Sequence, residues 1–142
     1  MREIKFRAWD KENKAFMPNE GYVICDGDVM GLRYGNEMED VLTDQVELMQ
    51  YTGLKDMHGV EIYECDIVQV NYSGNDDFSG LALVVFRNGC FELEGKIMKI
   101  INSEGIMYDD FYAISNDLSH YSACVKVIGN KFKNPKLMET VL

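Results

Sequence analysis

The segment from residue 46 to residue 72 constrains the fold more than any other part of the chain, because two strand-like runs flank a turn whose chemistry is readable. Asp56 can accept hydrogen bonds from the turn amides through its carboxylate, and His58 fits the third turn position. Gly59 supplies the positive φ that leads the chain into the next strand. The segment therefore predicts a bulged β-hairpin with a half-buried strand on each side.

The residues that follow predict further antiparallel strands. Residues 81–86 are apolar on both faces, which is typical of a strand in the middle of a sheet or barrel. The polar residues 73–80 are expected to form the loop before that strand. Asn88 and Gly89 are the pair preferred in a two-residue hairpin turn, and the returning strand should leave Glu92 exposed to solvent.

Three later segments carry weaker patterns. The apolar residues within 96–102 fit helical and strand spacing about equally, and we expect a strand there. Residues 109–122 mix aromatic and acidic side chains and are left open between helical and irregular structure. Residues 124–129 predict a last strand, and Asn134 followed by Pro135 resembles the start of a short helix.

Residues 1–45 are the least regular part of the sequence. Residues 4–8 alternate apolar and cationic side chains, and Trp9 falls on the cationic side of this first strand. Residues 22–25 predict a strand that ends at a glycine-containing turn. In that strand Cys25 is expected to behave as a small buried hydrophobe.

Short strands joined by tight turns predict a mainly β fold, an antiparallel barrel or roll with N-terminal hairpin additions and a short C-terminal helix. A chain of 142 residues fits one ordinary domain. We place that domain at residues 1–142, with an N-terminal hairpin segment at about 1–45 and a barrel-like core at about 46–132.

Charge and composition narrow the class of partner. With 24 acidic and 14 basic side chains the chain carries a formal charge of −10, which disfavours nucleic acid as a partner because phosphate binding depends on clustered Lys and Arg. No apolar run approaches the roughly 20 residues of a membrane helix, so no membrane is expected. Four cysteines occur singly, as in reduced intracellular proteins.

One acidic stretch contains no compensating lysine or arginine. It consists of Glu37, Glu39, Asp40, Asp44 and Glu47. Such a run usually forms a solvated face, and the sharper interpretation is a surface that binds a basic partner.

Residues capable of catalysis are sparse. His58 and His120 are far apart in sequence, and no Gly-x-Ser-x-Gly nucleophile motif occurs. Two adjacent acidic pairs could bind a divalent cation if loops brought their carboxylates together, namely Asp76 with Asp77 and Asp109 with Asp110. We expect no catalytic residue, no metal site and no cofactor.

Aromatic residues offer another kind of site. Tyrosine and tryptophan are favoured at interfaces because they bury a large area while keeping a polar tip. Because their sequence neighbours are polar, Trp9, Tyr51 and Tyr63 are the candidates for contact with a partner, although most aromatic residues will belong to the core.

The motifs QYTGLKD, EIYE and DIV in residues 50–68 resemble the signature of the YopX family of small phage and prophage proteins. The opening MREIKFRAWD and the closing VIGNKFKNP resemble the two ends of that family, which has no established biochemical function. The resemblance implies an SH3-type barrel or roll formed largely by the C-terminal two thirds, in the cytoplasm of a bacterial host. Relatives usually carry glycine where this chain has Cys65; if that glycine serves a positive φ, this chain must either adopt it with strain or rearrange locally.

These observations favour a noncatalytic protein-binding module. Its protein partner is unknown, and assembly into a homo-oligomer is an open alternative. A narrower alternative is an acidic inhibitor that imitates nucleic acid. The competing class is a metal-assisted enzyme with clustered carboxylates, and direct nucleic-acid binding ranks third.

Overall fold

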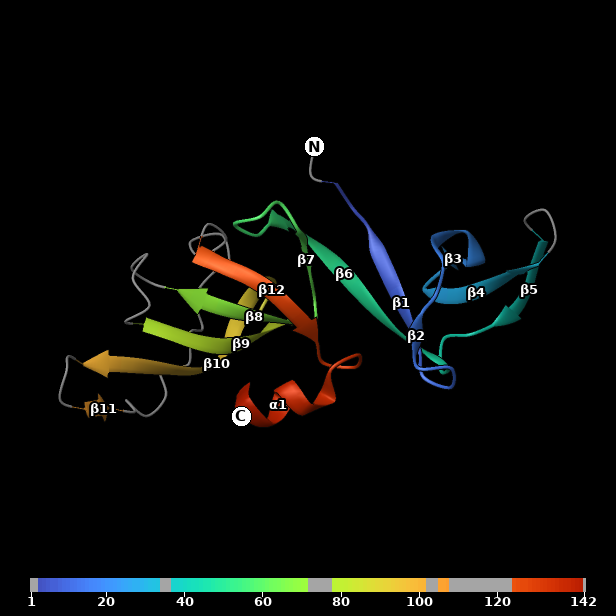
Figure 1. Ribbon diagram of the computed structural model, residues 1–142. Coiled ribbons are helices and arrows are strands. Elements are labelled where there is room, and N and C mark those ends of the chain that lie inside the picture. The colour runs from blue at the N-terminus through green and yellow to red at the C-terminus, as the bar shows by residue number, and fades with distance from the viewer. Residues whose placement is uncertain (1–2, 34–36, 72–77, 102–104, 108–123, 142) are drawn as a thin grey trace. The chain divides into compact units, whose positions relative to one another are not determined.

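The protein is mainly β: a computed structural model contains three antiparallel sheets, one of them a curled half-barrel, and one short C-terminal helix (Figure 1). The structure describes residues 3–33, 37–71, 78–101, 105–107 and 124–141. Within them no helix is long and apolar enough to cross a membrane. The chain divides into two compact units, an N-terminal unit (Ile4–Gln50) and a C-terminal unit (Tyr51–Leu142 with Met1–Glu3).

The N-terminal unit contains a hairpin and a separate three-stranded sheet. Strand β1 pairs on one side with β2 and on the other with the first half of β6, whereas the sheet has the order β3-β4-β5. The core of the N-terminal unit consists of Ala8, Tyr22, Val29 and Val46. The bounds are β1 (Phe6–Asp10), β2 (Ala15–Phe16), a 3-10 turn (Asn19–Gly21), β3 (Tyr22–Cys25), β4 (Asp28–Arg33), β5 (Glu37–Val41) and β6 (Val46–Lys55).

The C-terminal unit contains the second half of β6 and a five-stranded sheet of order β11-β10-β9-β8-β12. Strand β9 is central in this sheet, as its apolar sequence predicts. The bounds are β7 (Glu61–Tyr63), β8 (Asp66–Asn71), β9 (Phe78–Arg87), β10 (Cys90–Ile101), β11 (Gly105–Met107), β12 (Val125–Asn130) and α1 (Pro135–Val141).

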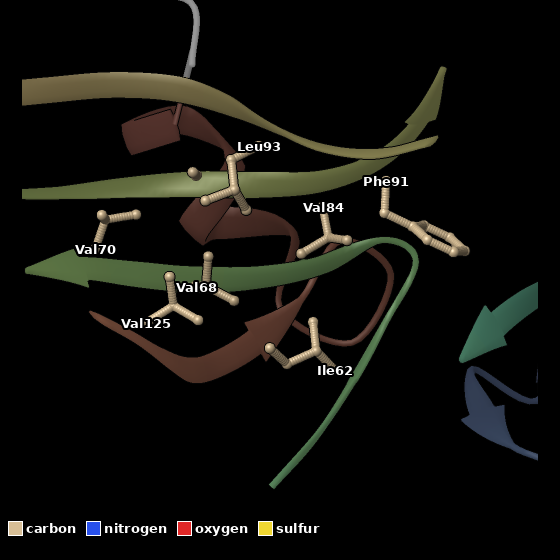
Figure 2. Packing of buried hydrophobic residues seen from close by; sticks show 8 residues of the cluster. Ile62, Val68, Val70, Val84, Phe91, Leu93 and Val125 are labelled. Atoms are coloured by element: carbon tan, nitrogen blue, oxygen red, sulfur yellow. The ribbon is translucent and has the colours of Figure 1, made fainter. Parts of the chain in front are cut away.

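Apolar side chains from five strands pack together on one face of this sheet. Figure 2 shows residues of β7, β8, β9, β10 and β12 converging. Burying side chains of this size stabilises the fold by about 1.5 to 3 kcal/mol each relative to exposure. The cluster consists of Ile62, Val68, Val70, Ala82, Val84, Phe91, Leu93 and Val125, with Leu54 and Val127 packed against it.

Helix α1 packs against the other face of the sheet. Ile67 and Leu83 form a second cluster with Val141 of the helix. The helix starts at Pro135, as predicted, and the Asn134 side-chain oxygen accepts a hydrogen bond from the backbone N–H of Asn130 at 3.1 Å.

Several turns and strands are confirmed. Asn88 and Gly89 have φ values of 53° and 81°, as the two-residue hairpin turn between β9 and β10 requires. Residues 96–101 belong to β10, so the preference for strand was correct. Residues 109–122 lie outside the described part of the chain.

Three expectations were wrong. Strand β9 begins at Phe78 rather than at residue 81, because the paired length with β8 extends to Asn71 opposite Ser79. Glu92 is buried because it lies opposite Val85, on the face that α1 covers. Cys25 is exposed because it ends its strand beside a turn.

Candidate functional site

The turn between β6 and β7 is organised by the carboxylate of Asp56. One oxygen accepts the backbone N–H groups of His58 at 2.8 Å and Val60 at 2.9 Å. The other accepts the N–H of Val127 in β12 at 2.9 Å. Gly59 completes the turn with a φ of 79°, so both predicted roles in this hairpin are confirmed.

Three charge-assisted hydrogen bonds also set the electrostatics of Asp56. Burial raises the pKa of this carboxyl, but the amides of Val127, Val60 and His58 together outweigh burial and hold the pKa below its ordinary value. His58 itself is exposed at the turn. Asp56 therefore stays ionised and engaged with the backbone, which suits it to fasten the turn to the edge of β12.

The residues before this turn form a bulge. Pairing between β6 and β7 shifts in register between Tyr51 and Lys55, and Gly53 within the shift has a φ of 84°. The hydroxyl of Thr52 donates to the carbonyl of Ile62 at 2.8 Å and accepts the N–H of Leu54 at 3.2 Å. The YTGL part of the motif therefore shapes the strand rather than presenting a reactive group.

A second carboxylate, Asp66, connects two distant motifs. Its oxygens accept the backbone N–H of Tyr63 at 2.9 Å and the side-chain amide of Asn130 at 3.3 Å. Asp66 and Asn130 are both almost fully buried. Asn130 in turn accepts the N–H of Phe132 at 2.9 Å, so the DIV and VIGNKFKNP motifs meet in one polar network.

Cys65, the residue before Asp66, has a φ of 66°. Its N–H donates to the carbonyl of Val84 at 2.8 Å, and its carbonyl accepts the N–H of Lys131 at 2.9 Å. Of the two alternatives, strain or local rearrangement, the chain therefore keeps the positive φ although the residue carries a side chain. The two backbone hydrogen bonds fix this conformation, which an L-residue adopts only with strain.

Trp9 does not form an exposed contact surface. It is 6% exposed, and its ring meets that of Phe16 edge to face at 5.0 Å between centroids. The Arg7 guanidinium lies 4.7 Å from the centre of the same Phe16 ring, so Arg7 and Trp9 share the face predicted for them. Polar sequence neighbours alone did not reveal that Phe16 would pack there.

Tyr51 and Tyr63 are brought together, because they are paired across β6 and β7. Their ring centroids lie 5.4 Å apart, Tyr51 is buried, and the partly buried Tyr63 donates its hydroxyl to Glu61 at 3.0 Å. This pair supports the hairpin as cross-strand aromatic contacts do. The role of these tyrosines and of Trp9 in binding a partner stays a prediction.

The structure places a different set of side chains at the surface. Pairing sets Val23 of β3 opposite Met30 of β4, and Met30 opposite Val41 of β5. We call these three residues the apolar row. Alternation in β3 and β4 was a usable signal, but finding the row required the pairing with β5.

Metal ligation has little support among the described residues, in which no three His, Cys, Asp or Glu side chains are grouped to hold an ion. The remaining candidates lie outside the described residues, namely Asp76, Asp77, Asp109, Asp110 and His120.

Comparison with solved structures supports the fold. The chain is similar to protein EF1440 from Enterococcus faecalis, with 24% identity and a TM-score of 0.56 over 97% of this chain and 99% of that one. It is also similar to the YopX protein of Bacillus subtilis, with 23% identity and a TM-score of 0.56 over the full length of both chains. No match was found among curated proteins.

The model of the family described as YopX protein matches residues 5–139. This range contains the Asp56 turn, the Asp66–Asn130 network and both ends that carry the sequence resemblance. The chain belongs to the YopX family, whose function is uncharacterised.

Proposed function

We propose that this protein is a noncatalytic protein-binding module. One observation carries the proposal: the two buried carboxylates of its most recognisable motifs, Asp56 and Asp66, are engaged by backbone and side-chain amides. A carboxylate that fastens strands together is not free to exchange protons or ligands with a substrate. The motifs therefore serve as a scaffold, and we place the binding function on the surfaces that the scaffold presents.

A narrower form of the proposal is an acidic inhibitor that occupies the nucleic-acid site of a host protein. The formal charge of −10 favours it, because such a site is lined by basic side chains.

The proposal includes an SH3-type roll for the C-terminal unit. Its support is the antiparallel order β11-β10-β9-β8-β12, together with a β6–β7 turn that is hydrogen-bonded to β12. The proposed place of action is the bacterial cytoplasm, in keeping with four free cysteines.

The test is affinity capture from bacterial lysate with the tagged full chain, compared with the same chain after heat denaturation and repeated at high salt. We expect a protein that is retained by the folded chain only. Retention of a nucleic-acid enzyme that is lost at high salt would favour the inhibitor, and a salt-resistant partner would favour an apolar interface. Equal retention by folded and denatured chains, or turnover of a substrate, would contradict the proposal.

A further inference from the structure

The sheet β3-β4-β5 has two different faces. Tyr22 and Val29 on one face are buried in the core of the N-terminal unit, and the side chain of Leu42 lies over Gly31 on that face. The apolar row lies on the opposite face, because successive residues of a strand alternate in direction. One sheet therefore has a packed side and an apolar outer side.

The outer face is exposed enough to receive another chain. Val41 is 56% exposed, Val23 and Met30 are half-buried, and Leu32 continues the apolar surface along β4. The row crosses three strands, which corresponds to about 10 Å at the usual spacing between strands. A contiguous apolar surface of this kind, bordered by polar residues, is a recognised mark of an interaction site.

The charge around this face indicates what binds there. Residues 15–50 contain eight acidic residues and a single basic one, Arg33. Asp26 and Asp28 are exposed at the turn between β3 and β4, and Asp28 lies opposite Cys25 on the same face as Val23. A second copy of this chain would bring like charges together, whereas a basic partner would gain attraction at the rim and burial at the centre.

We propose that the outer face of β3-β4-β5 binds a basic protein segment that alternates apolar and cationic side chains. The apolar side chains of the segment pack on Val23, Met30 and Val41, and its lysine or arginine residues face the aspartates at the rim. This inference rests on the proposed binding function and adds the surface and the class of partner. Phosphate-bearing ligands are disfavoured by the same acidic charge.

The probe is a short labelled peptide that alternates lysine and leucine, titrated with the full chain and followed by fluorescence anisotropy. One control peptide alternates glutamate and leucine, and another alternates lysine and serine. The protein variants are Val41→Lys and the matched control Val60→Lys, whose parent valine is 48% exposed in the β6–β7 turn. Both variants change the net charge equally.

We expect Val41→Lys to weaken binding of the lysine–leucine peptide at least about tenfold, and Val60→Lys to bind it as the parent chain does. Both control peptides should bind the parent chain at least about tenfold more weakly. The assignment would be overturned if the two variants bound the lysine–leucine peptide equally. It would also be overturned if the parent chain bound either control peptide as tightly as the lysine–leucine peptide. Val41→Thr keeps a β-branched residue in β5, and should weaken binding in the same direction without a change in thermal stability.

A charge variant and a capture experiment complete the test. The double variant Asp26→Asn and Asp28→Asn should bind the lysine–leucine peptide more weakly, and its binding should depend less on salt. Unchanged salt dependence would contradict the role of the aspartates at the rim. If lysate capture retains a protein equally well with Val41→Lys, the binding function stands and the assignment of this face falls. If the parent chain captures nothing, both fail.

Discussion

At the scale of single residues, the recognisable motifs are explained by backbone geometry. Asp56 supplies acceptors to three amides, and Gly59 and Cys65 adopt positive φ where the chain reverses. Each of these requirements follows from residue chemistry. The roles of Asp56 and Gly59 could be predicted from the sequence alone, whereas the conformation at Cys65 was indicated only by the family resemblance. What could not be predicted is the partner of the second Asp56 oxygen, because Val127 is far away in the chain.

Gly59→Val should lower the free energy of unfolding by about 1 to 3 kcal/mol, because it forces a β-branched residue into positive φ. A side chain at Gly59 has open space around it, so the loss reports backbone strain alone. Gly59→Asn is the control, since asparagine tolerates this conformation. Chemical denaturation measures both, and equal stability of the two variants would contradict the turn geometry.

Asp56→Asn should lower the free energy of unfolding by about 1 to 3 kcal/mol at neutral pH, because an amide NH₂ would face one of the N–H donors. The folded-state pKa of Asp56 lies below the ordinary value of 3.8, so its contribution is complete above that pH. The contribution disappears as the pH falls through the folded-state pKa.

Denaturation as a function of pH checks this expectation. The difference between the parent chain and Asp56→Asn should shrink below pH 3.8, whereas the exposed control Asp40→Asn should change stability little at any pH. A difference that grows towards acid would show that Asp56 is not held in its ionised form.

Cys65→Gly should raise the free energy of unfolding by about 0.5 to 1 kcal/mol, because relief of the left-handed conformation exceeds the entropy cost of glycine. Cys65→Ala keeps the strain and separates it from loss of the thiol. Thermal denaturation of the two variants measures the difference. A glycine variant no more stable than the alanine variant would show that Cys65 is unstrained at its φ of 66°.

At the scale of elements, turns and strands differ in how far local sequence determines them. The Asn88-Gly89 turn and β9 follow from local residue chemistry and pattern. Strand β5 does not, because an acidic run has no apolar alternation and its pairing with β4 is nonlocal. The exposure of Glu92 was wrongly predicted for the same reason, since α1 lies far along the chain.

The candidate contact residues show this limit most clearly. The sequence could identify Trp9, Tyr51 and Tyr63 as aromatic residues among polar neighbours, but their burial depends on Phe16 and on the pairing of β6 with β7. The apolar row depends on strand register across three strands, which no local pattern specifies.

Gly129→Ala should lower the free energy of unfolding by about 1 to 3 kcal/mol, because overpacking forces neighbouring groups to move. A Cβ at this position would lie 2.7 Å from the Asn134 Oδ1 and 2.8 Å from the Leu137 Cδ1. Gly21→Ala is the control, because its nearest contact would be an ordinary 3.7 Å from Pro18. Equal melting temperatures would contradict close packing of α1 against β12.

At the scale of the whole molecule, separate hydrophobic clusters support the two units. Val29 belongs to the core of the N-terminal unit, and Val84 belongs to that of the C-terminal unit. Because each core draws its members from one unit, damage to one core is expected to act first on its own unit.

Val29→Ala and Val84→Ala should each lower local stability by about 2 kcal/mol through lost burial and a cavity. Amide hydrogen exchange should show lost protection in residues 4–50 for the first variant and in the strands of the C-terminal unit for the second. Val84→Asp should have the larger effect, since it buries an unpaired carboxylate. If either alanine variant lost amide protection uniformly across the chain, the chain would unfold as one cooperative unit.

Strand β6 has a consequence for how such proteins can recombine. Its first half pairs with β1 and its second half with β7, so the boundary at Gln50 falls inside a continuous strand. A crossover between two related genes at that point would join the first half of β6 from one parent to the second half from the other. The two halves of the strand would then come from proteins in which they had different pairing partners. Viable chimaeras should instead inherit β1 through β7 from one parent, because Tyr22 and Val29 of the β3-β4-β5 sheet share a core with Ala8 of β1 and Val46 of β6.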